Sequence, residues 1–256
     1  MTTFSHSGTF GDLVYALGTV KHLGGGDFFL RLTNMDNMAK EVLGPHANAG
    51  QHSGEMTKKQ FDSLTSFMLS QPYIKSWNVW NGEEIDYALE YSGHEICKQN
   101  GNYAAGYARY NGINFEDNYK ELMLKPWLEI KDPIKIPGRP VVVNRVNRHL
   151  YGCDPELNGW KEFIRRGLSE VGIYVGLASE HAWFEQTLGI KIPHYATTDV
   201  LECARVIAGA EQFIGSQSMC LSLAVGLGKT FFCERRKDLP LERNECFYAR
   251  PNAHYF

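Results

Sequence analysis

The chain has 256 residues, a length that allows one large domain or two small ones. Hydrophobic residues make up 43% of it and charged residues 21%, which excludes a disordered chain, a collagen-like chain and a disulfide-stapled miniprotein. The 26 lysines and arginines are set against 29 aspartates and glutamates. The net charge of -3 provides no global basic field for nucleic acid, although a local patch stays open.

The cysteines and the first residues indicate the compartment. None of the six cysteines forms a C-x-x-C pair, so no zinc, iron–sulfur or redox signature is present. Cys203, Cys220 and Cys233 fall in apolar runs, which is typical of buried free thiols in a reducing compartment. The N-terminal residues lack a basic segment followed by an apolar one, and no apolar run approaches the ~20 residues of a membrane helix. We expect a cytoplasmic protein without a membrane span.

The first half alternates between short apolar runs and helical periodicity. Leu13, Leu17 and Val20 recur at helical spacing, and three consecutive glycines end that pattern. Residues rich in Tyr, Asn and Gly at 91–121 support no assignment. We expect strands at 2–5, 28–32 and 73–79, helices at 13–20 and 61–68, and a long loop at 34–58.

A proline-rich segment divides the chain. Three prolines lie between Lys125 and Pro140, and a residue before proline avoids the helical region. The segment is therefore expected to be extended and stiff. We interpret it as a linker between two domains, at 1–130 and 139–256.

The second half repeats the alternation. Asp199, with Glu202 three residues later, is expected to cap a helix. Strands that alternate with helices predict parallel sheets, so the fold class is α/β, with two facing Rossmann-like domains and ligands at the carboxyl ends of strands. We expect strands at 140–146, 171–177, 190–195, 213–214 and finally 230–233, and helices at 160–168, 180–188, 200–209 and 218–227.

The turn after the first strand is the first candidate site. Gly8 and Gly11 let backbone amides approach a ligand at a helix N-terminus, which favours anionic groups. Asp12 follows at or beside the N-cap, where it is either a plain helix cap or a general base that faces the cleft. His6 and Ser7 are close enough in sequence to line the same pocket for a substrate.

The turn before the last predicted helix is the second candidate. Gly215, Ser216, Gln217 and Ser218 present amides and hydroxyls that suit a phosphate at a helix N-terminus. An ordinary strand-to-helix turn is equally open. The Gly226–Thr230 segment is not a nucleotide P-loop, because the required upstream glycine is absent and the segment precedes a strand.

Two further strand ends carry polar residues. Asn144, Arg145 and Arg148 end the first strand of the second half, and the planar fork of arginine suits a diphosphate. Surface solvation is the alternative for both arginines. Glu180 follows Gly176 at the end of the next strand, where a carboxylate either accepts ribose hydroxyls or caps the next helix. The nine histidines show no metal-ligand spacing.

Together these turns resemble the heptosyltransferase-like glycosyltransferases, the ADP-heptose:lipopolysaccharide heptosyltransferase family. The stretch 7–21 (SGTFGDLVYALGTVK) is similar to the family's opening, with Gly11 and Asp12 as its Gly-Asp pair. Residues 204–229 are similar to its helix, strand and donor segment, and 176–180 to its G-x-x-x-E. The chain departs from the pattern at Gln217-Ser218-Met219, where the family has D-[ST]-G, at Ser222 for its histidine and at Gly18 for its proline.

The resemblance implies a GT-B glycosyltransferase that moves a sugar from a nucleotide-diphosphate donor to a hydroxyl acceptor, without a metal or cofactor. Asp12 would be its catalytic base, and the turn at 216–218 would hold the donor diphosphate. The acceptor class stays open between a modified base such as hydroxymethylated DNA, a glycan and a small molecule. The short chain resembles phage or bacterial accessory members. The alternatives are a sugar-nucleotide epimerase or hydrolase, and a non-catalytic nucleotide- or glycan-binding protein.

Overall fold

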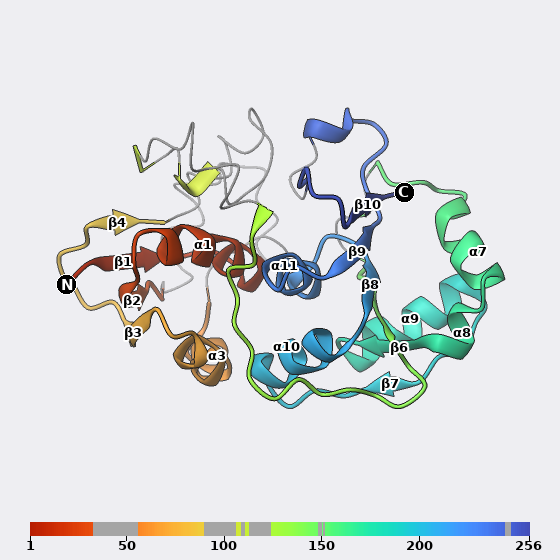
Figure 1. Ribbon diagram of the computed structural model, residues 1–256, viewed down its shortest axis with the longest axis horizontal. Coiled ribbons are helices and arrows are strands. Elements are labelled where there is room, and N and C mark those ends of the chain that lie inside the picture. Colours follow the sequence, from red (N-terminus) through yellow and green to blue (C-terminus); the bar gives the residue numbers. More distant parts are fainter. Residues whose placement is uncertain are drawn as a thin grey trace.

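The computed structural model describes residues 1–32, 56–89, 106–108, 111–112, 124–147, 150, 152–243 and 247–256. These residues form two parallel sheets with helices packed against them (Figure 1). Most of the loop expected at 34–58 and most of 91–121 lie outside the described residues, and so does Arg148.

The first sheet has four parallel strands in the order β3-β2-β1-β4. Phe4 of β1 pairs with Phe28 on one side and Tyr87 on the other, and its ring stacks on both at centroid distances of 6.4 and 5.6 Å. These cross-strand aromatic contacts fix the register. The strands are β1 (Thr3–His6), β2 (Gly26–Leu30), β3 (Ile74–Val79) and β4 (Tyr87–Ala88), and the helices are α1 (Phe10–His22) and α3 (Lys58–Ser70).

The second sheet has six parallel strands in the order β10-β9-β8-β5-β6-β7. Its first strand in the chain, β5, lies between β8 and β6, and all four of its residues are buried, as is typical of a parallel strand covered on both faces. The strands are β5 (Val141–Asn144), β6 (Gly172–Val175), β7 (His194–Tyr195), β8 (Gln212–Gly215), β9 (Thr230–Cys233) and β10 (Ala253–Tyr255). The helices are α7 (Asn158–Arg165), α8 (Leu168–Val171), α9 (Ala178–Leu188), α10 (Val200–Gly209), α11 (Met219–Gly226) and the 3-10 turn η2 (Leu241–Arg243).

The two sheets are joined through helices, with α1 against α11 and α3 against α10 (Figure 1). All residues from Cys220 to Gly226 are buried in α11, and all from Leu13 to Val20 are buried in α1. A helix that is apolar all round is a buried helix. One apolar cluster therefore runs from the first sheet through these two helices to the second sheet.

The segment between the sheets is packed between these helices. Trp127 is 1% exposed; its indole Nε1 donates to the carbonyl of Val14 at 2.9 Å, and its backbone N donates to that of Gly226 at 2.9 Å. A Cβ on Gly18 would lie 3.4 Å from the Trp127 ring, so the indole lies in van der Waals range of α1 at this glycine. The first residues of the proline-rich segment therefore connect α1 to α11 through Trp127.

Most of the expected elements are present, and the α/β class with two parallel sheets is confirmed. The Asp199 carboxylate caps α10 by accepting from the backbone N of Glu202 at 2.8 Å, as expected. The helix expected at 160–168 is divided, because Gly167 adopts φ 89° and ends α7 before α8 begins.

Two expectations about strands were wrong, and the strands β4 and β10 were not expected. The strand β9 is not the last, since β10 follows it. Strands of two or three residues are too short to show a period. The strand expected at 190–195 is only His194–Tyr195, directly after Pro193, which lacks an amide hydrogen for a ladder bond.

Candidate functional site

The turn from β1 to α1 is held by contacts among its own residues. The Nδ1 atom of His6 accepts from the backbone N of Gly8 at 2.8 Å. The Thr9 backbone N and hydroxyl both donate to Oδ2 of Asp12, at 3.2 and 2.8 Å. Thr9 is the N-cap, and Asp12 is its partner in a capping box three residues on. The capping role of Asp12 is therefore confirmed, while its role as a base stays a prediction.

His6 lies beneath this turn and is fully buried. Burial lowers the pKa of His6 to about 3, so the ring is neutral at physiological pH. Because Nδ1 accepts from an amide, the ring hydrogen is on Nε2, which lies 3.4 Å from the hydroxyl oxygen of Tyr107. His6 was expected to line a substrate pocket, but its burial makes it a support of the turn.

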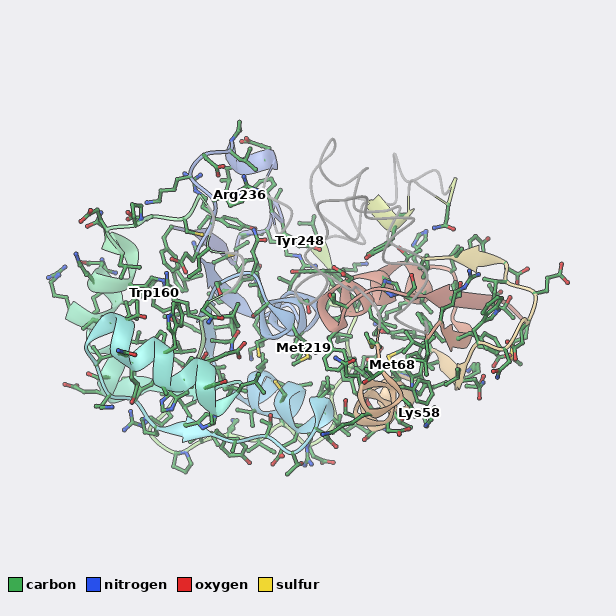
Figure 2. The ribbon with its side chains drawn as sticks, turned by 180° about the vertical axis from the view of Figure 1, so that it is seen from behind. Lys58, Met68, Trp160, Met219, Arg236 and Tyr248 are labelled. Atoms are coloured by element: carbon green, nitrogen blue, oxygen red, sulfur yellow. The ribbon has the colours of Figure 1, made fainter. Side chains whose placement is uncertain are left out.

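Two glycines shape the surface of the turn. A Cβ on Gly8 would lie 2.4 Å from Cε1 of His6 and 3.2 Å from Oδ2 of Asp12, so only glycine fits beside the carboxylate. A Cβ on Gly11 would lie 3.8 Å from the backbone N and Cα of Met219, the first residue of α11. Figure 2 shows Met219 where the two halves of the molecule meet. The first turn of α1 therefore lies against the start of α11, and Ser7 and Asp12 in this segment are half-buried.

The turn from β8 to α11 is tied to the end of β5. The Ser216 hydroxyl accepts from the backbone N of Val146 at 3.0 Å, and the Ser216 backbone N donates to the carbonyl of Asn144 at 3.1 Å. Ser218 is the N-cap of α11, and its hydroxyl accepts from the backbone N of Leu221 at 3.3 Å. Ser216 is buried, whereas Gln217 and Ser218 are half-buried at the start of the helix.

A third group lies at the ends of β5 and β6. The side-chain Nδ2 of Asn144 donates to the carbonyl of Val175 at 2.8 Å, while its Oδ1 is buried and has no partner among the described residues. A Cβ on Gly176 would lie 2.7 Å from that Nδ2 and 3.3 Å from Oε2 of Glu180. Glu180 accepts from the backbone N of Leu177 at 3.3 Å and so caps α9, as one of its two interpretations predicted.

Arg145 is buried at the end of β5, and its contact to a diphosphate stays a prediction. It is only 3% exposed, so surface solvation is wrong, and its guanidinium does not extend into open solvent. Its Nε and Nη2 donate to the two carboxylate oxygens of the buried Glu234, at 2.7 and 2.8 Å. The guanidinium lies over the rings of Trp183 and Trp160 at 5.0 and 5.7 Å. Its Nη1 is buried and unpaired within the described part of the chain.

Glu234 was missed, although two signals for this pair exist. Glu234 is the first residue after the strand β9, as Arg145 is the first residue after β5. Side chains alternate along a strand, so Arg145 continues the face of Val141 and Val143, which pack into the core beside α7 and α9. The period of β5 therefore predicts a buried Arg145, and a buried arginine needs a carboxylate.

Other features of the described residues lie away from these turns. A hollow of about 410 Å³ lies beside Glu185 and Lys191, and one of about 560 Å³ lies beside Met1 and Asp86. Across the described ranges, no three His, Cys, Asp or Glu side chains are grouped to hold a metal ion. No described helix is long and apolar enough to cross a membrane.

The fold is similar over the whole chain to that of solved glycosyltransferases. The glycosyl transferase of family 9 from Veillonella parvula DSM 2008 matches with a TM-score of 0.60 and 7% identity, covering 100% of this chain and 85% of that one. The heptosyltransferase WaaC of E. coli with ADP matches with a TM-score of 0.61 and 10% identity, over 100% and 92%. The E. coli ADP-heptose LPS heptosyltransferase II matches with a TM-score of 0.54 and 11% identity, over 100% and 90%.

These matches confirm the resemblance at the level of fold, which is the GT-B arrangement of two Rossmann-like domains. No protein-family model matches the sequence, and no curated protein matches it. At such low identities the similarity is one of architecture, and the chemistry has to be argued from the residues themselves.

Proposed function

We propose that the protein is a glycosyltransferase that moves a sugar from a nucleotide-diphosphate sugar to a hydroxyl group. The observation that supports this most is the contact between the two candidate turns. A Cβ on Gly11 would lie 3.8 Å from the backbone of Met219, so the first turn of α1, which carries Asp12, lies against the N-terminus of α11. A general base thus adjoins a helix end that favours anions.

The proposed reaction uses both turns. The Asp12 carboxylate takes the proton of the acceptor hydroxyl as its oxygen bonds to the anomeric carbon of the sugar. The bond from that carbon to the diphosphate oxygen breaks, and its electrons stay with the diphosphate. The amides and dipole of α11, with Gln217 and Ser218 at its start, stabilise this leaving charge.

The second half, residues 139–256, is the proposed donor domain. Asn144, Gly176 and Glu180 would face the nucleoside, because amide and carboxylate oxygens accept hydroxyl and amino hydrogens. Arg145, paired with Glu234, ties the end of β5 to the end of β9 beside the turn at 216–218, and Arg148 is the proposed direct contact to the diphosphate. The proposed acceptor side is residues 1–130, where Ser7, Gly8 and Gly11 surround Asp12. Metal independence is part of the proposal, and EDTA treatment tests it.

A panel of sugar nucleotides tests the reaction. Each is incubated with the protein, alone and with three acceptor classes: hydroxymethylated DNA, a glycan and a small alcohol. Release of nucleoside diphosphate only when an acceptor is present supports transfer. Release without any acceptor indicates a hydrolase, and interconversion of the donor sugar indicates an epimerase.

A non-catalytic nucleotide-binding protein is the second candidate. Two observations favour it: the Asp12 carboxylate is already engaged in a capping box, and the Arg145 charge is already paired with Glu234. This candidate predicts donor binding without turnover, and binding that Asp12→Ala leaves unchanged. Calorimetry with the same panel distinguishes it from the enzyme.

A further inference from the structure

Three ring-bearing side chains form a cluster beside the proposed donor site, on the face of β6 and β7 that α9 covers. Tyr174 of β6 pairs in register with His194 of β7. His181, from the first turns of α9, stacks on His194 at a centroid distance of 4.9 Å and contacts Tyr174 at 5.1 Å. The cluster comprises Tyr174, His181 and His194.

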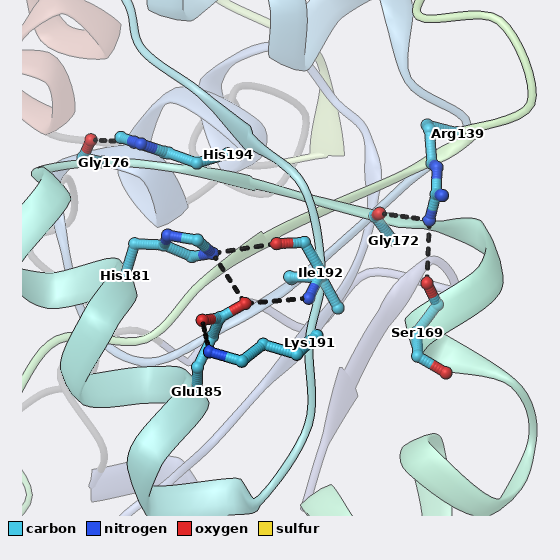
Figure 3. Close-up of polar contacts among 9 residues, drawn as sticks. All are labelled: Arg139, Ser169, Gly172, Gly176, His181, Glu185, Lys191, Ile192 and His194. Atoms are coloured by element: carbon cyan, nitrogen blue, oxygen red, sulfur yellow. Dashed lines mark hydrogen bonds and ion pairs between the residues drawn. The ribbon is translucent and has the colours of Figure 1, made fainter.

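Each member of the cluster donates one hydrogen bond to a backbone carbonyl. Tyr174 donates to Arg145 at 2.8 Å, His181 Nε2 to Ile192 at 2.9 Å and His194 Nε2 to Gly176 at 2.9 Å (Figure 3 shows the two histidines). Burial raises the pKa of Tyr174, so its phenol keeps the proton that it donates. A carbonyl only accepts, and therefore both imidazoles carry their hydrogen on Nε2.

The bond from His194 holds an unusual stretch of backbone. Gly176 adopts φ 149°, which residues with side chains rarely take, and a Cβ there would collide with Asn144. The carbonyl of Val175 is held by Asn144 and the next carbonyl, of Gly176, is held by His194. Two consecutive peptide groups are thus fixed from opposite sides, one from β5 and one from β7.

We propose that His194 is a positioning residue for the donor, which holds the turn from Gly176 to Glu180 in the geometry that binds the nucleoside part. This inference rests on the proposed function. The turn carries the Glu180 carboxylate, which accepts hydroxyl hydrogens and repels phosphate. The nucleoside therefore faces this turn while the diphosphate faces the start of α11. His194 touches no substrate and acts through the carbonyl of Gly176.

His181 provides a matched control. It is the same residue type in the same cluster, and it also loses one Nε2 bond to a carbonyl when replaced by phenylalanine. Its acceptor is Ile192, which lies before β7, on the side of Glu185 and Lys191 (Figure 3). No bond of His181 reaches the Gly176 turn among the contacts of the described residues, and its Nε2 also lies 3.4 Å from Oε1 of Glu185. Its loss therefore tests the packing of the cluster and the contacts to Ile192 and Glu185, without the bond to Gly176.

The test compares nucleoside diphosphate binding by calorimetry in wild type, His194→Phe, His194→Gln and His181→Phe, with melting temperatures for all four. We expect His194→Phe to raise the Kd about 3- to 10-fold, as the loss of a neutral hydrogen bond implies. Since glutamine keeps a side-chain N–H, His194→Gln should recover most of the affinity. His181→Phe should bind like wild type even where its melting temperature falls. With a saturating acceptor, His194→Phe should raise the donor KM and leave kcat unchanged.

The outcomes separate this inference from the proposed function. Wild-type protein that binds no nucleoside diphosphate overturns both. Wild-type binding with an unchanged His194→Phe, or an equal loss in His181→Phe, overturns the positioning role alone. Should a variant fail to fold, nitrogen NMR of the wild-type imidazoles decides, because a neutral His194 that carries its hydrogen on Nδ1 contradicts the bond to Gly176.

Discussion

The candidate site is formed by the turn from β1 to α1 and by the carboxyl edge of the second sheet. The hydrogen bonds that hold these two regions span different distances along the sequence. In the turn from β1 to α1, most bonds join residues two or three positions apart, as between His6 and Gly8 or Thr9 and Asp12, and His6 also reaches a distant residue, Tyr107. At the carboxyl edge of the second sheet they span 18 to 89 positions, from His194 with Gly176 to Arg145 with Glu234.

This difference determines whether a substitution changes the chemistry of one side chain or the stability of the fold. A local turn is a unit of its own, so a side chain in it can lose its chemistry while the rest of the fold stays intact. A long-range network shares its members between strands, so one substitution there changes stability and binding together. Variants in the turn from β1 to α1 therefore test the chemistry of the side chain. Variants at the carboxyl edge of the second sheet test how the site is held together.

Asp12→Asn should give the largest effect. An amide keeps an oxygen to accept from the Thr9 backbone N, but it cannot take the acceptor's proton. The transfer rate should fall roughly 10²- to 10⁴-fold. The lost charge in the first turn of α1 should cost only about 0.3–1 kcal/mol of unfolding free energy. Rate and urea denaturation are measured on the same preparation, and a near-normal rate would leave Asp12 as a capping residue only.

Glu234→Gln should have its main effect on stability, whereas Asp12→Asn should have its main effect on the transfer rate. Both members of its pair are nearly inaccessible, at 3% and 2% exposure, so removing one charge leaves the other buried without a partner. The unfolding free energy should fall by about 3–5 kcal/mol, and donor affinity should weaken with it. The double variant Arg145→Met with Glu234→Leu should recover much of the stability. Loss of activity at an unchanged unfolding free energy would contradict a structural role for the pair.

His6 makes the local turn sensitive to pH. Burial lowers the pKa of His6 from 6.5 to about 3, so below pH 6.5 the unfolded chain binds a proton that the folded protein does not. The stabilisation by neutral His6 is complete above pH 6.5 and declines as the pH falls towards 3. The decline should reach about 1.4 kcal/mol per pH unit. His6→Asn, which keeps an acceptor for Gly8, should flatten the dependence of unfolding free energy on pH, and an unchanged slope would refute this source.

The same difference explains what could be predicted from the sequence. The cap of α10, Asp199, and the turn around Asp12 rest on spacings of three residues, and the alternation of elements reveals the two parallel sheets. The contacts of Glu234 and His194 depend on strand order, which places β9 and β7 on opposite sides of β5. A single sequence contains no local signal of that order, so the contact partners of both residues could not be predicted, even where the burial of Arg145 could.

Ser218→Gly should give the smallest effect on stability and separates two roles at the start of α11. Glycine is a good N-cap, so its cost should be only a few tenths of a kcal/mol, against about 1 kcal/mol for Ser218→Ala. If the hydroxyl contacts the donor diphosphate, both variants should raise the donor Kd by a similar factor despite their different stabilities.

Thr57→Gly is the control for this comparison. The Thr57 hydroxyl caps α3 by accepting from the backbone N of Gln60 at 3.3 Å, the same distance as in the cap of Ser218. Unlike α11, α3 packs against the first sheet. Calorimetry should show no change in donor affinity for Thr57→Gly, because its cap lies outside the proposed site. If affinity instead tracks melting temperature across all three variants, Ser218 acts only by holding α11 in place. The start of α11 would then bind the diphosphate through its backbone amides alone.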